Sequence, residues 1–319
     1  MAMIDIFNGD ADGICALVQL RNAEPGVSQL VTGVKRDIAL VAQVDCASGD
    51  ELTVLDISFD KNRAGVDKAL QAGASIRYFD HHFAGEVAQH DRLQTWINTA
   101  SDICTSLLVN QYLDGAYRAW AVVGAFGDNL KNSARGAAKA LELSTSQLAS
   151  LEALGTYINY NGYGAGVEDL HFDPQLLYRK LVPYADPLAF IAEDSDTFGK
   201  LEHGYQQDMA AAANIEPDYQ SASVAVFGFP NEAWARRVSG VYSNDLANAN
   251  PGRAHAVLTE NADGSYLVSV RAPLNNKTGA DEICRQFPSG GGRKAAAGIN
   301  ELPAESLQLF IDTIDKFYA

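Results

Sequence analysis

Short apolar runs alternate with helical patterns in the first part of the chain. Four of these runs have the length and composition of buried strands: Met3–Asn8, Gln29–Val34, Leu52–Ile57 and Ala74–Phe79. Strands that are separated by helical crossovers predict a parallel sheet with helices on both faces. In such a sheet, ligands bind at the carboxyl ends of the strands.

The pattern then becomes helical and later returns to alternating strands and helices. A helix is predicted over Tyr117–Phe126, with Gly127, Asp128 and Asn129 as its stop, and Asn159–Glu168 is predicted to be a loop. Further on, strands are predicted at 222–229, 253–258 and 266–271, and helices at 232–249, 279–287 and 304–317. This predicts a second, smaller α/β unit.

The length of the chain also favours two domains. A chain of 319 residues exceeds what one hydrophobic core usually spans. We place the domains at residues 1–213 and 221–319, with the connection near Asn214–Gln220. A cleft between two domains is a natural place for a ligand.

The charge of the chain limits its partners. Forty acidic residues against twenty-four basic residues give a formal net charge of −16, which argues against a broad surface for long nucleic acid. Small anionic ligands remain compatible with this charge if divalent cations load the site first. Oligomeric state is left open, with a homodimer as one assembly that the chain could form.

The cysteines and the N-terminus indicate no special targeting. Cys15, Cys46, Cys104 and Cys284 are widely spaced and form no CxxC pair, so we expect buried thiols rather than a zinc site or disulfides. There is no signal-peptide pattern and no apolar run long enough to span a bilayer. We therefore expect a cytoplasmic protein without a membrane partner.

Acidic residues and histidines follow several predicted strands. They occur in the turn Asn8–Gly13 with Asp10 and Asp12, at Asp56, at Asp80-His81-His82, and at Asp128 after a helix. Taken singly, each has an ordinary structural reading as a turn residue, a cap or a satisfied histidine pair. Together, several carboxylates at one sheet edge repel one another unless cations neutralise them, which favours a site for manganese or a similar ion.

At this point the sequence resembles the DHH phosphoesterase superfamily. The resemblance lies in Asp10-Ala11-Asp12-Gly13, Asp56, Asp80-His81-His82 and Gly127-Asp128, in that order. The second half resembles the DHH-associated domain through Val268-Ser269-Val270-Arg271 and the glycine run from Ser289 to Gly298. The resemblance implies a parallel-sheet domain that holds two manganese ions, with magnesium as an alternative, and a smaller domain that binds substrate.

The resemblance also implies roles for single residues. Asp10 and Asp56 would hold one ion, and Asp12, Asp56, His81 and Asp128 the other. Asp80 would orient the histidine pair and His82 would contact phosphate. Arg271, Gly291, Gly292 and Arg293 would bind the phosphate of the substrate, and Asn8, beside the first ion, would also bind substrate. Hydrolysis would use water activated by the metal, without a covalent enzyme intermediate.

Two positions depart from the pattern of the superfamily. Asn8 stands where many relatives have a histidine or another ligand, and Arg293 stands where the second-domain pattern has histidine. The architecture resembles enzymes that hydrolyse short 5'-phosphorylated oligonucleotides, so we expect a phosphodiesterase for linear dinucleotides such as pGpG. The alternatives are a RecJ-like single-strand exonuclease, a bisphosphate or pyrophosphate phosphatase, and a nucleotide sensor with weakened catalysis.

Overall fold

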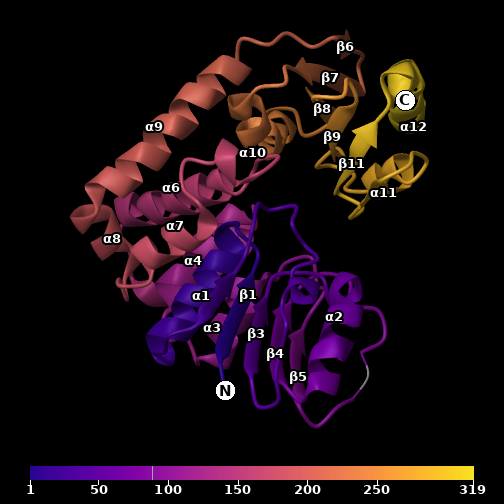
Figure 1. The fold of residues 1–319 in the computed structure, drawn as a ribbon. Helices are drawn as coiled ribbons and strands as arrows, with labels where there is room; N and C mark the ends of the chain where they lie inside the picture. Colours follow the sequence, from indigo (N-terminus) through magenta and orange to yellow (C-terminus); the bar gives the residue numbers. More distant parts are fainter. Residues whose placement is uncertain (88) are drawn as a thin grey trace. The chain divides into compact units, whose positions relative to one another are not determined.

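The computed structural model describes residues 1–87 and 89–319 and divides into two compact units, Met1–Glu202 and His203–Ala319. Each unit contains its own sheet, and the element order is followed most easily in Figure 1. The division falls within one helix, α9 (Ser195–Ala212). Our domain boundaries at residues 213 and 221 stay a prediction.

The first unit is built on an all-parallel sheet of five strands. These are β1 (Met3–Phe7), β2 (Gln29–Val31), β3 (Glu51–Leu55), β4 (Ser75–Asp80) and β5 (Leu93–Ile97), in the spatial order β2-β1-β3-β4-β5. The predicted parallel sheet is confirmed. Strand β5 was not predicted, because this edge strand is only partly buried and lacks an apolar run.

Alternate residues of the strands face opposite layers. Ile4, Leu52 and Ile76 are cross-strand neighbours whose side chains are buried against α2 (Phe59–Ala72). The opposite face is covered by α1 (Ala11–Ala23), α3 (Thr105–Tyr112) and α4 (Arg118–Gly127), and Figure 1 shows α1 and α2 on the two sides of the sheet. Helices therefore cover both faces, as predicted.

The rest of the first unit is helical. Its helices are α5 (Lys131–Ala138), α6 (Thr145–Asn161), α7 (Pro174–Leu181) and α8 (Pro187–Glu193), which lead into α9. The predicted loop at Asn159–Glu168 was wrong at its start. Asn159, Tyr160 and Asn161 form the last turn of α6 because all three side chains are buried by tertiary contacts, which outweigh their weak helix propensity.

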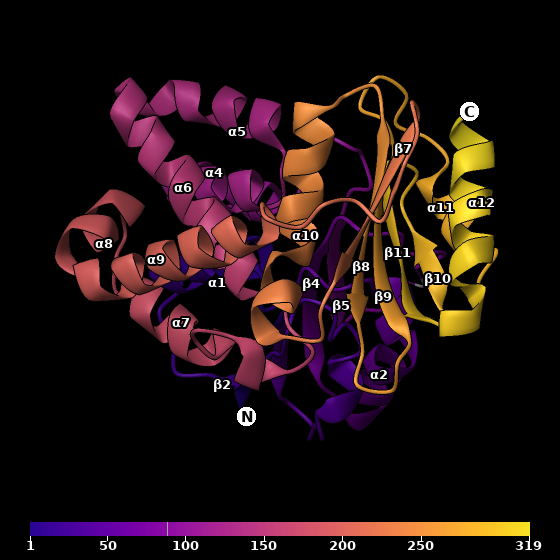
Figure 2. The ribbon, with the colours of Figure 1, turned by 90° about the horizontal axis from the view of Figure 1, so that it is seen from above.

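The second unit has a mixed sheet of six strands in the order β10-β11-β9-β8-β7-β6. The strands are β6 (Tyr219–Gln220), β7 (Val224–Phe229), β8 (Ala254–Glu260), β9 (Tyr266–Arg271), β10 (Gly290–Gly292) and β11 (Ala296–Leu302). Helices α11 (Ala280–Cys284) and α12 (Leu307–Tyr318) lie on one face and α10 (Ala233–Ala249) on the other, as Figure 2 shows. This confirms the second α/β unit.

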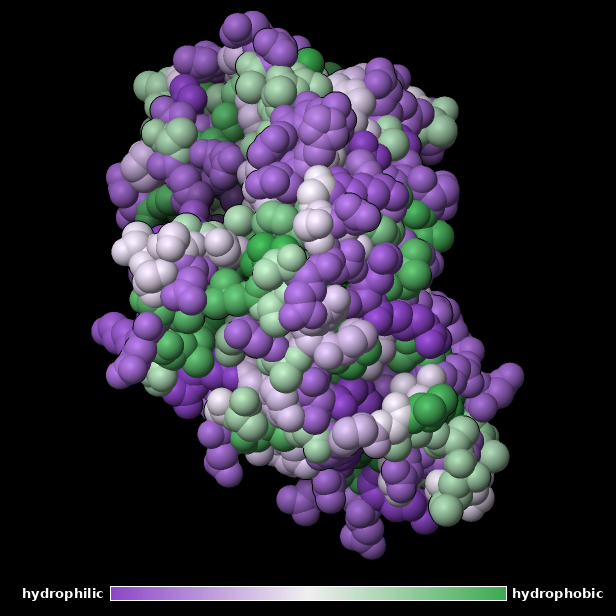
Figure 3. Space-filling model, turned by 90° about the vertical axis from the view of Figure 1, so that its left-hand side faces the viewer, coloured by the Kyte–Doolittle hydropathy of each residue, from purple (hydrophilic) through white to green (hydrophobic). Residues whose placement is uncertain are grey.

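Polar residues dominate the exposed surface. On the face in Figure 3, hydrophilic residues cover most of the area and hydrophobic residues are scattered between them. Among the described residues, no helix combines the length and apolar composition that a membrane crossing requires. Of the four cysteines, Cys15, Cys104 and Cys284 are buried free thiols and Cys46 is partly exposed.

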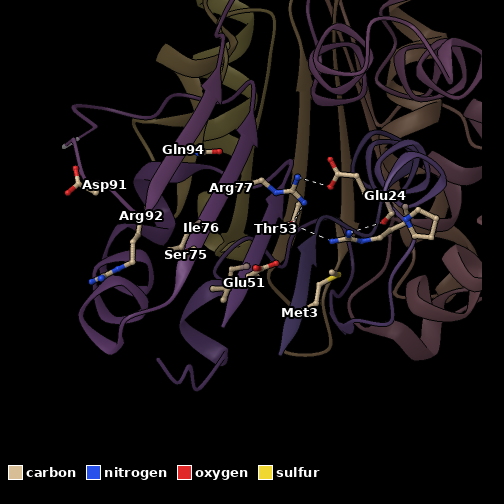
Figure 4. Close-up of a pocket in the computed structure, with 13 residues that line it drawn as sticks. Met3, Glu24, Glu51, Thr53, Ser75, Ile76, Arg77, Asp91, Arg92 and Gln94 are labelled. Carbon is tan, nitrogen blue, oxygen red and sulfur yellow. Dashed lines mark hydrogen bonds and ion pairs between the residues drawn. The ribbon is translucent and has the colours of Figure 1, made fainter. Parts of the chain in front are cut away.

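A buried ion pair joins α1 to the sheet near the amino ends of its strands. Arg21 donates from Nε to Asp5 Oδ2 at 2.8 Å, and its Nη2 lies against Asp5 Oδ1 and Thr53. Arg77 on β4 binds Glu24 at 2.8 Å, as drawn in Figure 4. These groups border a cavity of about 390 Å³ at the starts of β1, β3 and β4, away from the acidic strand ends.

We expect Arg21→Ala to lower the free energy of unfolding by about 3–5 kcal/mol, because it leaves the fully buried Asp5 carboxylate without its cation. Urea denaturation measures this change. The control is Lys68→Ala, which removes the exposed pair with Asp45 and should cost about 1 kcal/mol or less. Equal effects of the two substitutions would contradict the structural role of the buried pair.

Candidate metal centre

The acidic residues lie where the strand order of the first sheet reverses. Strand β1 has β2 on one side and β3 on the other, so the chain leaves β1 and β3 in opposite directions and opens a crevice at their carboxyl ends. Asp10 and Asp12 follow β1, Asp56 follows β3, and Asp80 is the last residue of β4. The sheet thus brings four predicted site residues to one edge.

Asp12 is held by the amino end of α3. Its Oδ2 accepts from the backbone N–H of Thr105 at 2.7 Å, and its Oδ1 accepts from that of Ser106 at 2.8 Å. The helix dipole stabilises a carboxylate at this position. Each carboxylate oxygen has two lone pairs, so Asp12 keeps acceptor capacity toward the crevice.

Three carboxylates surround one ring nitrogen of His81. Its Nε2 lies 3.4 Å from Asp56 Oδ1, 3.9 Å from Asp12 Oδ2 and 3.9 Å from Asp128 Oδ2. The other nitrogen, Nδ1, lies 3.1 Å from the carbonyl oxygen of Ile103. Because a carbonyl can only accept, Nδ1 is the donor to Ile103, and Nε2 is the ring nitrogen that faces the carboxylates.

The position of Asp128 depends on close packing of α4 against α1. Asp128 caps the C-terminal end of α4, as predicted for this residue. A Cβ at the preceding Gly127 would lie 2.3 Å from the Cβ of Ala11, so a larger residue would push the two helices apart. Glycine at position 127 therefore lets Asp128 reach the crevice.

This arrangement fits a divalent cation. Ligand atoms that share one ion at bonds of about 2.1 Å lie about 3–4 Å apart, which is the spacing around His81 Nε2. Asp128 Oδ2 is buried and has no hydrogen-bond partner among the described residues, an arrangement that costs free energy unless a cation binds there. Asp56, His81 and His82 can also approach a common ion.

The electrostatics of Asp56 indicate the same need for a cation. Burial raises the pKa of the Asp56 carboxyl well above its ordinary value, and the charges of Asp12 and Asp10 raise it further. Thr105 Oγ1 donates to Asp56 Oδ1 at 3.0 Å, yet this bond does not offset the other effects. The residue also adopts a left-handed backbone conformation with φ of +60°, a strained geometry that is common at functional sites.

Asp80 contacts only one of the two histidines. Its Oδ1 lies 2.7 Å from His82 Nδ1, and its Oδ2 accepts from the backbone N–H of Phe59 at 3.3 Å. Burial alone would lower the pKa of His82, but the bond to Asp80 outweighs burial and raises it. His81 takes its orientation from Ile103, so the expected positioning of both rings by Asp80 applies to His82 alone.

Lys35 is a charged residue in this region that the sequence analysis missed. Its Nζ forms an ion pair with Asp10 Oδ2 and donates to Asn159 Oδ1 at 3.1 Å. Burial tends to lower the pKa of Lys35, but the charge of Asp10 raises it overall; in turn, Lys35 overcomes the effect of burial on Asp10 and lowers its pKa. Lys35 follows β2 at the same sheet edge, which is the signal that could have identified it.

Asn8 is held by two hydrogen bonds within the turn region. Its Nδ2 donates to the carbonyl of Lys35 at 3.1 Å, and its Oδ1 accepts from the backbone N–H of Asp10 at 3.2 Å. Both polar atoms of the amide are therefore used within the protein. These two bonds fix Asn8 in the turn around Asp10.

The remaining predicted residues belong to the second unit. Arg271 is bound to Asn244 Oδ1 at 2.7 Å and to Ser269 Oγ at 3.0 Å, while Arg293 is exposed beyond β10. Gly291 and Gly292 belong to an edge strand paired with β11, not to a free loop. Gly292 has φ of +140°, and a Cβ there would lie 2.5 Å from Ala297, so glycine is required.

Comparison with known proteins identifies the architecture. No protein-family model matches the sequence, and no curated protein matches it significantly. Among solved structures, RecJ exonuclease bound to manganese aligns with a TM-score of 0.62 and 16% identity over 99% of this chain and 90% of that chain. RecJ from Thermus thermophilus in complex with Mn²⁺ aligns with a TM-score of 0.67 and 16% identity over 99% of this chain, which spans 52% of that longer chain.

A third structure is a pGpG-specific phosphodiesterase, PggH from Vibrio cholerae. It aligns with a TM-score of 0.55 and 12% identity over 99% of this chain and 98% of its own. The chain shares its fold with the RecJ and PggH structures. At 12–16% identity, these alignments show a common fold.

The first sheet carries a buried, charge-repelled carboxyl, that of Asp56, directly after β3, and this predicts a pH effect on stability. Because the pKa of Asp56 is raised on folding, the folded state holds its proton more tightly, and its contribution to stability falls as pH rises from about 4 through the raised pKa. Asp56→Asn should therefore stabilise the chelator-treated protein above this range, by about 1.4 kcal/mol for each unit of raised pKa.

Urea denaturation of both proteins between pH 4 and pH 8 tests this expectation. The difference should vanish near pH 4 and grow with pH, and added Mn²⁺ should reverse it by stabilising only the native protein. Asp91→Asn, at an exposed carboxylate, is the control and should change little at any pH. A pH-independent difference for Asp56→Asn would contradict the assignment.

Proposed function

We propose that this chain is a manganese-dependent phosphodiesterase that hydrolyses short 5'-phosphorylated linear nucleotides, with pGpG as the representative substrate. The observation that carries the proposal is the group of three carboxylates within 3.4–3.9 Å of His81 Nε2. Carboxylate oxygens with one imidazole nitrogen suit manganese. The DHH fold shared with RecJ and PggH supports phosphoester hydrolysis as the reaction class.

Asp12, Asp56, His81 and Asp128 would hold the ion. When bound, a divalent ion supplies Lewis-acid activation of water and offsets negative charge on the phosphate. The protein contributes a preformed ligand set: α3 fixes Asp12, Thr105 fixes Asp56, and the Ile103 carbonyl fixes the His81 tautomer.

His82 is the residue that we assign to the phosphate. Asp80 binds its Nδ1, which directs Nε2 to other ligands, and the ring side chain is 37% exposed while Asp80 is fully buried. The raised pKa favours the charged ring, which can donate a hydrogen bond from Nε2 to a phosphate oxygen. Asp80 acts through His82 and is a positioning residue.

Phosphate binding by the second unit remains part of the proposal. A Cβ at Gly291 would meet no described atom within 4 Å, so its lack of a side chain has no packing reason and would let a ligand approach the backbone. Arg293 is exposed next to this strand and its guanidinium matches the geometry of phosphate. Arg271 is anchored to Asn244 and Ser269, which would hold it in one orientation.

Substitution of His81 tests the site. With Mn²⁺, the native protein should convert pGpG to mononucleotides. His81→Ala should lower kcat by about 100-fold or more because the ion loses its imidazole ligand. His90→Ala, at an exposed histidine, should retain native turnover. Native turnover in His81→Ala would exclude this metal centre, and pGpG binding without cleavage would indicate a nucleotide sensor.

Substrate length separates the phosphodiesterase from the alternatives. The net charge of −16 disfavours long polyanions, so we expect kcat/KM to be higher for pGpG than for a ten-nucleotide single strand, a 3',5'-bisphosphate or pyrophosphate. Product analysis by ion-exchange chromatography measures each rate under the same Mn²⁺ concentration. A preference for the ten-nucleotide strand would favour a RecJ-like exonuclease, and a preference for either small phosphate would favour a phosphatase.

A further inference from the structure

Asp10 already has a cation partner within the protein. Its Oδ2 pairs with Lys35, and its Oδ1 accepts the backbone N–H groups of Asp12 at 3.0 Å and Gly13 at 3.2 Å. Asp10 is 3% exposed, so its ion pair with Lys35 is shielded from bulk water. Its acceptor positions are thus largely occupied by groups of this chain.

Lys35 is held in a built site and is not a mobile surface lysine. Its backbone N–H donates to the carbonyl of Gly162 at 2.8 Å, and its own carbonyl accepts from Asn8. Its Nζ binds Asn159 in the last turn of α6, where a helix dipole favours a cation, and lies 5.4 Å from the ring centroid of Tyr163. Two segments of the chain, the turn at Asn8 and the end of α6 with residues 162–163, thus hold Lys35 beside Asp10.

We infer that Lys35 supplies the second positive charge of this centre, so that the chain binds one divalent ion and not two. The Lys35 ammonium pairs with the Asp10 carboxylate that a second ion would need. The amide of Asn8 is hydrogen-bonded to the backbone. The inference departs from the two-ion expectation of the sequence. It rests on the proposed function only in taking the His81 group as an ion site.

The charges at this edge of the sheet support a single bound ion. Asp10, Asp12, Asp56 and Asp128 bring four carboxylates to one edge, and Lys35 with one divalent ion supplies three positive charges against them. A second ion beside Asp10 would have to approach the fixed ammonium at short range, and like charges repel strongly in a partly buried site. Lys35 thereby positions Asp10 and excludes the second ion.

Metal stoichiometry tests the inference without substrate. Chelator-treated protein titrated with Mn²⁺ and followed by isothermal calorimetry should bind about one ion per chain, and Lys35→Ala should raise this number to about two. Lys61→Ala, at an exposed lysine, is the control and should stay at one. Two ions in the native protein, or one ion in Lys35→Ala, would overturn the role of Lys35.

Electron paramagnetic resonance of the native protein provides a second readout if Lys35→Ala does not fold. Bound Mn²⁺ should show the spectrum of isolated ions at every ratio, whereas an exchange-coupled spectrum would overturn the inference. One bound ion without pGpG hydrolysis would remove only the proposed function. Two bound ions with hydrolysis would remove only this inference, and no bound Mn²⁺ would remove both.

Discussion

Repulsion between carboxylates at the carboxyl edge of the parallel sheet is the interaction on which this site depends. The effect of this repulsion differs among four carboxylates, those of Asp10, Asp12, Asp56 and Asp128. Lys35 neutralises Asp10, the amino end of α3 stabilises Asp12, and the pKa of Asp56 rises. Asp128 is left with a buried oxygen that has no partner in the described residues. The charge that remains uncompensated is concentrated around His81, and that concentration makes the edge a candidate cation site.

At the opposite end of the same sheet, the charged side chains are paired with one another. There, Asp5 is bound by Arg21, and Glu24 by Arg77, so charges near the strand starts are satisfied within the protein. The Asp5–Arg21 pair ties α1 to the sheet, and α1 carries Asp12 in its first turn. One helix thus couples a satisfied, stabilising end to an unsatisfied, functional end. Sites of this kind lower stability where function requires it.

In the second unit, several elements were predicted from the sequence, whereas β10 and β11 were not. The strands β7, β8 and β9 and the helix α10 lie where alternating apolar residues indicated them. Gly290–Gly292 forms an edge strand because β11 offers it a pairing partner, and that partner, Ala296–Leu302, is not evident from local composition. Strand pairing is a tertiary property, so glycines that suggest a loop can join a sheet.

The sequence by itself determined the parallel α/β sheet and the placement of Asp10, Asp12, Asp56 and Asp80 at strand ends, because hydrophobic periodicity and chain order encode both. Only the tertiary structure decided how each charge is compensated. Lys35 meets Asp10 across 25 positions and Asn159 across 124, and Thr105 meets Asp12 across 93. Such long-range contacts produce no periodic pattern in the sequence. They arise from strand order and helix packing, which bring distant residues to one edge and leave His81 among three carboxylates.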